Sequence, residues 1–220
     1  MKFRDLPIST RLVAYTLSAL ALFLIWDQYF WWKLRDEYAF GFIVPLFVIY
    51  VIYERWPVLA KSLIGDGKPT EEAPESGLIR FIELGVQGIA ILMVMGGLVS
   101  FLMGGVYRAM EGQNLISSNF LAFGFANILL GCAYLYADKR ASGASIPFAE
   151  RWHLALLFLF PALIWMLSVP MFSAVHKTIS TFLMNKVAVF VYYMFDVLGF
   201  AVIREGSILK LPLGDVGVED

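Results

Sequence analysis

Long apolar runs alternate with short polar segments along most of the chain. A helix needs about 20 apolar residues to cross the hydrocarbon core of a bilayer. Five runs meet or approach that length: residues 12–32, 40–53, 78–106, 115–136 and 152–170. The pattern predicts an all-α integral membrane protein, and its Gly-Gly pairs in "AILMVMGG" and "SFLMGG" predict close helix packing.

A sixth apolar run covers residues 179–200, but Asn185, Lys186 and Asp196 interrupt it. Such a segment can span the membrane, or it can lie along the interface as an amphipathic helix. The sequence leaves both alternatives open. We therefore expect five or six transmembrane or interfacial helices.

The chain ends with the sequence "FAVIREGSILKLPLGDVGVED", which is typical of extended structure. Residues 201–203 and 208–211 form two apolar arms, and residues 205–207 between them form a glycine-containing turn. Residues 216–218 have the composition of a further strand. The pattern predicts a short C-terminal β-hairpin after the last helix.

One hydrophilic segment divides the apolar runs, at residues 60–77 with the sequence "AKSLIGDGKPTEEAPESG". Its Gly, Pro and Glu residues are typical of a solvated loop. We expect a single polytopic membrane domain over residues 1–220, with this loop inside it.

Lys and Arg are concentrated in alternate polar segments between the helices. This distribution predicts which side of the membrane each segment faces. The N-terminal segment and the segments before the third and fifth runs carry more Lys and Arg than the others do. We expect a cytoplasmic N-terminus in a bacterial inner membrane. The basic N-terminus has no small-residue cleavage site after its apolar run, so we interpret that run as an uncleaved transmembrane helix.

Composition narrows the possible chemistry. The chain is 60% hydrophobic with a net charge of −1, which favours membrane lipid and gives no electrostatic case for nucleic acid. Its mean hydropathy is +0.72. One cysteine, Cys132, excludes a disulfide within the chain and a multi-cysteine metal site. No nucleotide or metal motif is present, so we expect no cofactor and no metal.

Few polar residues in the apolar runs are candidates for chemistry. Cys132 has no base or cation close in sequence, so a small packing residue is the favoured interpretation. His153, His176 and Lys177 are better explained as anchors at the headgroup level than as an anion site. Asp196 either faces a buried partner or water-lined site, or faces water on a surface helix.

The stretch "WKLRDEYAFGFIVPLFVIYVIYERW" combines several local signals. Charged residues lead to Tyr38, and Gly41 and Pro45 follow at the entrance of an apolar helix. Gly permits close backbone approach, and Pro in the first turn of a helix lacks only a donor that would be unpaired anyway. The pattern predicts a tight helix entrance, and a plain helix start with an aromatic belt explains it equally well.

These residues resemble the exosortase/archaeosortase family. The family has a Ser-His-Gly-x-x-x-Pro pattern where this chain has Gly41 and Pro45, with Ala39 and Phe40 in the Ser and His places. The segment 151–170 is similar to an Arg-Trp-led helix of the family. The segment from Leu198 resembles its Leu-Gly-x-x-Val-x-Arg-x-Gly-Asn pattern, and matches at Arg204 and Gly206 with Ser207 in the Asn place.

The resemblance implies a membrane cysteine peptidase or transpeptidase. Such enzymes cleave and sort exported proteins that carry a C-terminal signal, made of a Pro-Glu-Pro-type motif, a transmembrane helix and a basic tail. In the family a Cys-Ser-Gly motif follows the hairpin. We therefore expect the nucleophile just after Asp220, no catalytic residue among these 220, and a longer domain of which this is the N-terminal part.

Within these residues the resemblance implies supporting roles only, for Tyr38, Gly41, Pro45, Arg204 and Gly206. The alternative is a complete, non-catalytic membrane scaffold or binding protein. A small transporter subunit is a weaker alternative, because the third and fourth runs show few paired polar residues. The sequence defines neither the substrate nor the oligomeric state.

Overall fold

A computed structural model describes residues 5–64, 77–170, 173–200, 202–206, 208–211 and 214–217. The chain divides into two compact units, Met1–Pro170 and Met171–Asp220. We call them the bundle unit and the C-terminal unit, and each is described by itself.

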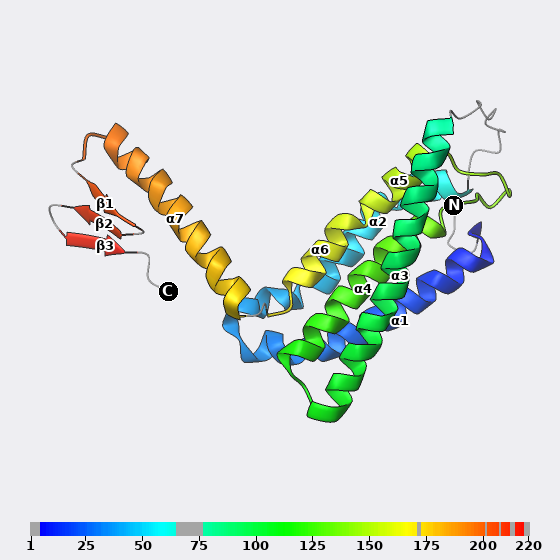
Figure 1. Ribbon diagram of the computed structural model, residues 1–220, viewed down its shortest axis with the longest axis horizontal. Helices are drawn as coiled ribbons and strands as arrows, with labels where there is room; N and C mark the ends of the chain where they lie inside the picture. Colours follow the sequence, from blue (N-terminus) through cyan, green and yellow to red (C-terminus); the bar gives the residue numbers. More distant parts are fainter. Residues whose placement is uncertain are drawn as a thin grey trace. The chain divides into compact units, whose positions relative to one another are not determined.

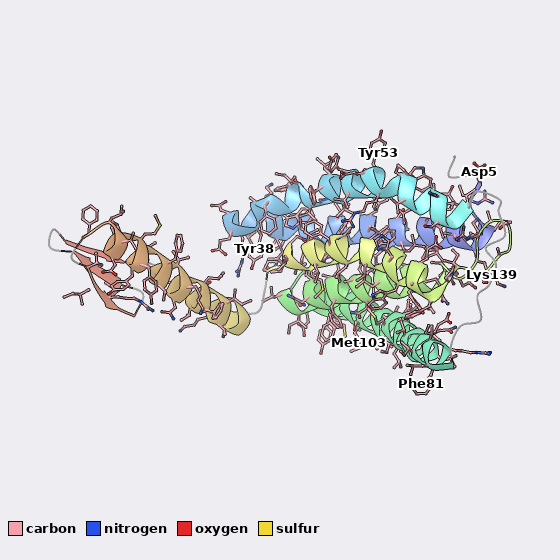
Figure 2. The ribbon with its side chains drawn as sticks, turned by 90° about the horizontal axis from the view of Figure 1, so that it is seen from above. Asp5, Tyr38, Tyr53, Phe81, Met103 and Lys139 are labelled. Atoms are coloured by element: carbon pink, nitrogen blue, oxygen red, sulfur yellow. The ribbon has the colours of Figure 1, made fainter. Side chains whose placement is uncertain are left out.

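The bundle unit consists of helices that run alongside one another (Figure 1). In chain order they are α1 (Ile8–Leu34), the 3₁₀ helix η2 (Asp36–Phe42), α2 (Val44–Ile64), α3 (Gly77–Glu111), α4 (Leu115–Leu135), α5 (Phe148–Leu157) and α6 (Leu159–Leu167). Figure 2 marks the two ends of the bundle, with Tyr38 at one and Lys139 at the other. We call the first the η2 end.

In the described residues, six helical segments are long and apolar enough to cross a membrane, which confirms the predicted all-α membrane fold. Five lie in the bundle unit, where η2 with α2 and α5 with α6 each count as one segment. The predicted loop over residues 60–77 is wrong at its start, because α2 continues to Ile64. Residues 65–76 of that prediction lie outside the described residues.

The outer surface of the bundle is apolar, as lipid contact requires. Tyr53 and Phe81, labelled in Figure 2, are 78% and 75% exposed. The interior core lies where α1, α2, α4 and α6 meet, around Leu24, Val48 and Trp165. Bilayer-facing apolar residues on helices with apolar interiors are typical of membrane-spanning bundles.

Helices α3 and α4 pack closely through glycines, as the Gly-Gly pairs of α3 predict. A Cβ atom added at Gly97 would lie 2.8 Å from the carbonyl oxygen of Gly124 and 2.9 Å from Ile128 Cγ1. A Cβ atom at Gly124 would lie 2.6 Å from the backbone nitrogen of Phe101. Backbone atoms cannot move aside, so only glycine permits this approach.

The junction of α5 and α6 shows how a transmembrane proline is accommodated. Pro161 has no N–H to donate to the carbonyl of Leu157, four residues earlier. The guanidinium of Arg55, on α2, donates to that carbonyl instead. A side chain from a neighbouring helix thus pairs the backbone group that proline leaves free.

The C-terminal unit comprises α7 (Ser173–Val197) and a three-stranded antiparallel sheet in the order β1-β2-β3 (Figure 1). The strands are β1 (Ile203–Glu205), β2 (Ile208–Leu211) and β3 (Gly214–Gly217). Ile203 pairs with Lys210 across the first hairpin, and Leu209 pairs with Val216 across the second. α7 contacts both β1 and β2.

The predicted C-terminal hairpin is confirmed as β1 and β2, with shifted limits. Glu205, predicted in the turn, ends β1, whereas Val202 precedes the strand. Gly206 follows with φ +66°, a left-handed conformation that favours glycine. The predicted strand segment 216–218 is replaced by β3, which begins earlier, at Gly214. Ala201, Ser207 and Val218 lie outside the described residues.

The α3–α4 contact yields a matched test. We expect Gly97→Ala to lower the free energy of unfolding by about 1–3 kcal/mol, because the new methyl group meets the backbone of α4. Gly96→Ala is the control, since nothing lies within 4 Å of a Cβ atom there. The measurement is denaturant unfolding in detergent micelles or bicelles. Equal stability of the two variants would contradict the close contact.

Candidate functional site

A cluster of buried polar side chains lies toward the η2 end of the bundle. Asp27 and Gln28 of α1 are both 0% exposed, and Asp27 is the one charged residue between Leu12 and Trp32. Burying a carboxylate in a membrane protein is costly, so such residues pair with other groups or mark functional positions. The partners of Asp27 come from α3 and α4.

Both carboxylate oxygens of Asp27 are paired. Arg108 of α3 forms an ion pair with Oδ1, and the hydroxyl of Ser118 on α4 donates to Oδ2 at 2.6 Å. Trp31 Nε1 donates in turn to Ser118 Oγ at 2.8 Å. The Arg108 guanidinium also lies 4.2 Å from the centre of the Trp26 ring. Three helices are therefore joined through one carboxylate.

The neighbouring Gln28 and Trp32 extend the cluster to the end of α6. Ser168 Oγ lies 3.1 Å from Gln28 Oε1 and 2.7 Å from the carbonyl of Trp165. Trp32 Nε1 donates to the carbonyl of Ser168 at 2.8 Å. Carbonyls at the C-terminus of a helix have no partner within the helix, so this indole bond stabilises the end of α6.

Asn119 of α4 provides a second link to the same segment. Its Nδ2 donates to the carbonyl of Pro170 at 2.9 Å and to that of Leu115 at 2.8 Å. The N-terminus of α4 is itself capped, because the side chain of Asn114 accepts from the backbone N–H of Ser117 at 2.7 Å. The end of α6 is thus held by side chains of both α1 and α4.

η2 packs directly against this cluster through Gly41. A Cβ atom at Gly41 would overlap Nε1 of Trp32, so the indole occupies the space that any side chain would need. Tyr38 is buried at 7% exposed. Pro45 is half-buried near the start of α2, where its missing N–H costs little. Tyr38, Gly41 and Pro45 therefore lie together at the η2 end.

The other two predicted supporting residues lie in the C-terminal unit. Arg204 Nε donates to the carbonyl of Gly206 at 2.7 Å, across the turn between β1 and β2. The geometry gives this pair a local role in shaping the hairpin. Asp196 is exposed on α7.

The remaining candidates do not form a reactive constellation in the described part of the chain. Cys132 is 8% exposed on α4, and His153 is exposed on α5. The side chain of His176 lies outside the described set. Within that set, no group of three or more His, Cys, Asp or Glu residues could hold a metal ion.

Ionic contacts also stabilise the opposite end of the bundle. Arg151, the first residue of the Arg-Trp segment, forms an ion pair with Glu83 at 2.6 Å and lies 4.5 Å from the centre of the Tyr134 ring. Arg140 pairs with Glu150 at 2.8 Å. Arg151 joins α5 to α3 and α4, which gives it a structural role.

The pattern of apolar runs does not predict the cluster around Asp27. The third run is expected to end at residue 106, but α3 continues to Glu111 and places Arg108 within the helix. Few paired polar residues are expected near the third and fourth runs, yet Arg108 and Ser118 are both paired with Asp27. The available signal was "WDQYFWW", in which adjacent Asp and Gln residues interrupt an apolar run.

The fold and the buried cluster define a polytopic membrane protein with a polar core at one end. Comparison with family models gives a match to the transmembrane exosortase model over residues 31–220. The chain belongs to the transmembrane exosortase family, and the predicted resemblance is confirmed. No curated protein and no solved structure matches the chain.

The contact between Gly41 and Trp32 can be tested by making the same substitution in the unchanged protein and in a Trp32→Leu variant. We expect Gly41→Ala to lower the free energy of unfolding by about 1–3 kcal/mol, because the added methyl group displaces the Trp32 indole. In a Trp32→Leu background the same substitution should cost much less, since the ring is gone. Unfolding in bicelles measures both. An equal cost in the two backgrounds would show that the indole does not set the requirement for glycine.

Proposed function

We propose that this protein acts in the cleavage and sorting of exported proteins that bear a C-terminal Pro-Glu-Pro-type signal. The observation that carries the proposal is the family match, which covers residues 31–220. The buried polar cluster supports it, since ionisable residues within membrane helices commonly mark functional regions. The chemistry is that of a cysteine peptidase or transpeptidase.

In this chemistry a cysteine thiolate attacks the carbonyl carbon of a peptide bond near the signal motif. The C–N bond breaks, a general acid protonates the leaving amine, and a thioester remains on the enzyme. An amine or water then attacks the thioester and releases the thiol. None of these steps is assigned to Cys132, because burial at 8% exposed within α4 keeps its thiol from a peptide substrate.

The residues of this chain have positioning roles in the proposal. Tyr38, Gly41 and Pro45 shape the entrance to α2, and Trp32 joins that entrance to the end of α6. Arg204 and Gly206 shape the hairpin that, by family resemblance, leads toward the nucleophile. The proposed topology has a cytoplasmic N-terminus in a bacterial inner membrane, supported by the distribution of Lys and Arg. The η2 end then faces the exported substrate.

A non-catalytic scaffold or binding protein is the second candidate. The observation that favours it is that the one cysteine of these 220 residues is buried in α4. Such a protein would bind signal-bearing proteins without cleaving them.

A reporter protein with the C-terminal signal separates the two candidates. Co-expressed with the 220-residue chain alone, the reporter should remain uncleaved, because no accessible thiol is present. In a form extended by a segment that carries both the Cys-Ser-Gly motif and a general acid, we expect thiol-dependent processing. Arg204→Ala should lower that processing several-fold, because the bond to Gly206 is lost. The processed fraction is read on immunoblots.

Arg80→Ala is the matched control, since Arg80 is an exposed cation in the first turn of α3. Unchanged processing by Arg204→Ala would contradict the hairpin role. If the 220-residue chain cleaves the reporter and Cys132→Ala abolishes this cleavage, Cys132 is catalytic. That result would overturn its interpretation as a buried residue without a catalytic role. A reporter that is retained but uncleaved, even with the extended form, would favour the scaffold.

A further inference from the structure

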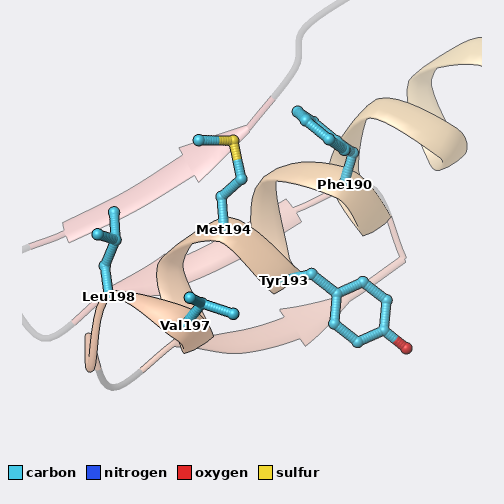
Figure 3. A pocket seen from close by; sticks show the side chains of 5 residues that line it. All are labelled: Phe190, Tyr193, Met194, Val197 and Leu198. Atoms are coloured by element: carbon cyan, nitrogen blue, oxygen red, sulfur yellow. The ribbon is translucent and has the colours of Figure 1, made fainter.

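The exposed face of α7 carries a continuous apolar stripe. Phe190, Tyr193, Met194, Val197 and Leu198 line a shallow groove on it and are 50–85% exposed (Figure 3). Their spacing of three and four residues places them on one side of the helix. Ile179, Leu183 and Val187 continue the stripe toward the N-terminus and are also exposed. We call these eight residues the α7 stripe.

The other side of α7 faces the β-sheet. α7 contacts β1 and β2, and its less exposed positions include Met184, Val191 and Phe195. Ala188, near the middle of the apolar segment Lys177–Val197, is only 1% exposed. Figure 1 shows the sheet beside the second half of the helix. The sheet thus lies beside residues that would be within the hydrocarbon region if α7 crossed the membrane.

This arrangement is incompatible with a membrane-spanning α7. In the described strands, β1 and β3 each pair on one side only, so each leaves a row of backbone N–H and C=O groups without a strand partner. Open sheet edges exposed to lipid do not occur in the hydrocarbon region, because no water is available to pair them. The apolar composition of α7 therefore needs an explanation other than spanning.

We infer that α7 lies along the membrane surface, with the α7 stripe in the lipid interface and the sheet in water. α7 begins at Ser173, six residues after the last residue of α6, Leu167, so its start is tethered close to the end of a transmembrane segment. Interfacial helices bury one apolar face by about 5–10 Å and keep cations able to reach the headgroups.

The charged and aromatic residues of α7 are compatible with lipid headgroups and acyl chains against the α7 stripe. Lys186 lies on the same side as the α7 stripe, with its ammonium 5.5 Å from the centre of the Phe182 ring. A long lysine stem can cover apolar surface while its charge reaches a phosphate. Tyr193, at 61% exposed, combines an apolar ring with a polar tip, as residues at headgroup level do. Exposed Asp196 remains on the water side.

A surface position of α7 does not depend on the proposed function. It decides between the two alternatives for residues 179–200, which are to span the membrane or to lie along the interface. With α7 on the surface, the bundle unit supplies five transmembrane segments. The sheet then lies on the same side of the membrane as the η2 end. A spanning α7 would put the sheet on the side of Lys139.

Spin labels at single cysteines measure the depth of α7 in lipid. In a Cys132→Ala background, labels replace Leu183, Phe190 and Val197 of the α7 stripe, with Thr181 on the other side as control. Leu22, 67% exposed near the middle of α1, is the deep reference. Leu183 and Val197 are about 21 Å apart along the helix. Relative accessibility to oxygen and to a water-soluble nickel complex reports depth in vesicles with anionic lipid.

We expect the three stripe labels to lie at one shallow depth, within about 5 Å of one another, with Thr181 in water. Leu183 and Phe190 labels as deep as Leu22, with Val197 shallow, would show that α7 spans and would overturn the inference. Stripe labels that contact neither lipid nor water would place another protein surface on the stripe, which overturns it as well.

A labelling experiment in intact cells and inverted vesicles tests the topology separately. Single cysteines replace Ile203 in β1, Arg35 before η2, and Lys139 at the opposite end, all exposed positions. A membrane-impermeant maleimide should label residues 203 and 35 from one side and residue 139 from the other. Labelling of residue 203 together with residue 139 would overturn the inference.

Discussion

The ion pair between Asp27 and Arg108 is the interaction on which the η2 end of the bundle depends. A buried carboxylate without a partner would be strongly unfavourable in a membrane protein. Arg108, from α3, and Ser118, from α4, pair the two oxygens, and Trp31 orients the serine hydroxyl. Because these groups come from three helices, their pairing fixes how α1, α3 and α4 lie relative to one another.

Further contacts extend outward from this pair by direct packing. Gln28 lies next to Asp27 in α1, and Trp32 lies one turn further along the helix. Both contact Ser168 at the end of α6. Trp32 also fills the space beside Gly41, so the position of η2 follows from the position of the indole. A family motif that looks local in the sequence is therefore supported by distant segments.

The sequence predicts the elements of this fold well because hydrophobic length and turn composition are local properties. All six apolar runs are helical, and the hairpin forms around Gly206. The cluster around Asp27 was missed because pairing between α1 and α3 depends on tertiary structure. The bond from Arg55 to the carbonyl that Pro161 leaves free is equally invisible in the sequence. Residues 60–64 contain none of the Gly, Pro and Glu residues that indicate the loop, and α2 continues through them.

The central claim is that Asp27 and Arg108 stabilise the bundle as a pair. A double-mutant cycle with Asp27→Asn and Arg108→Met, unfolded in bicelles, tests it most directly. Each single variant should lose about 3–5 kcal/mol, since it leaves a buried group unpaired. The double variant should lose less than the sum by about 1–3 kcal/mol. Strictly additive losses would show that the two residues act independently and would contradict the account.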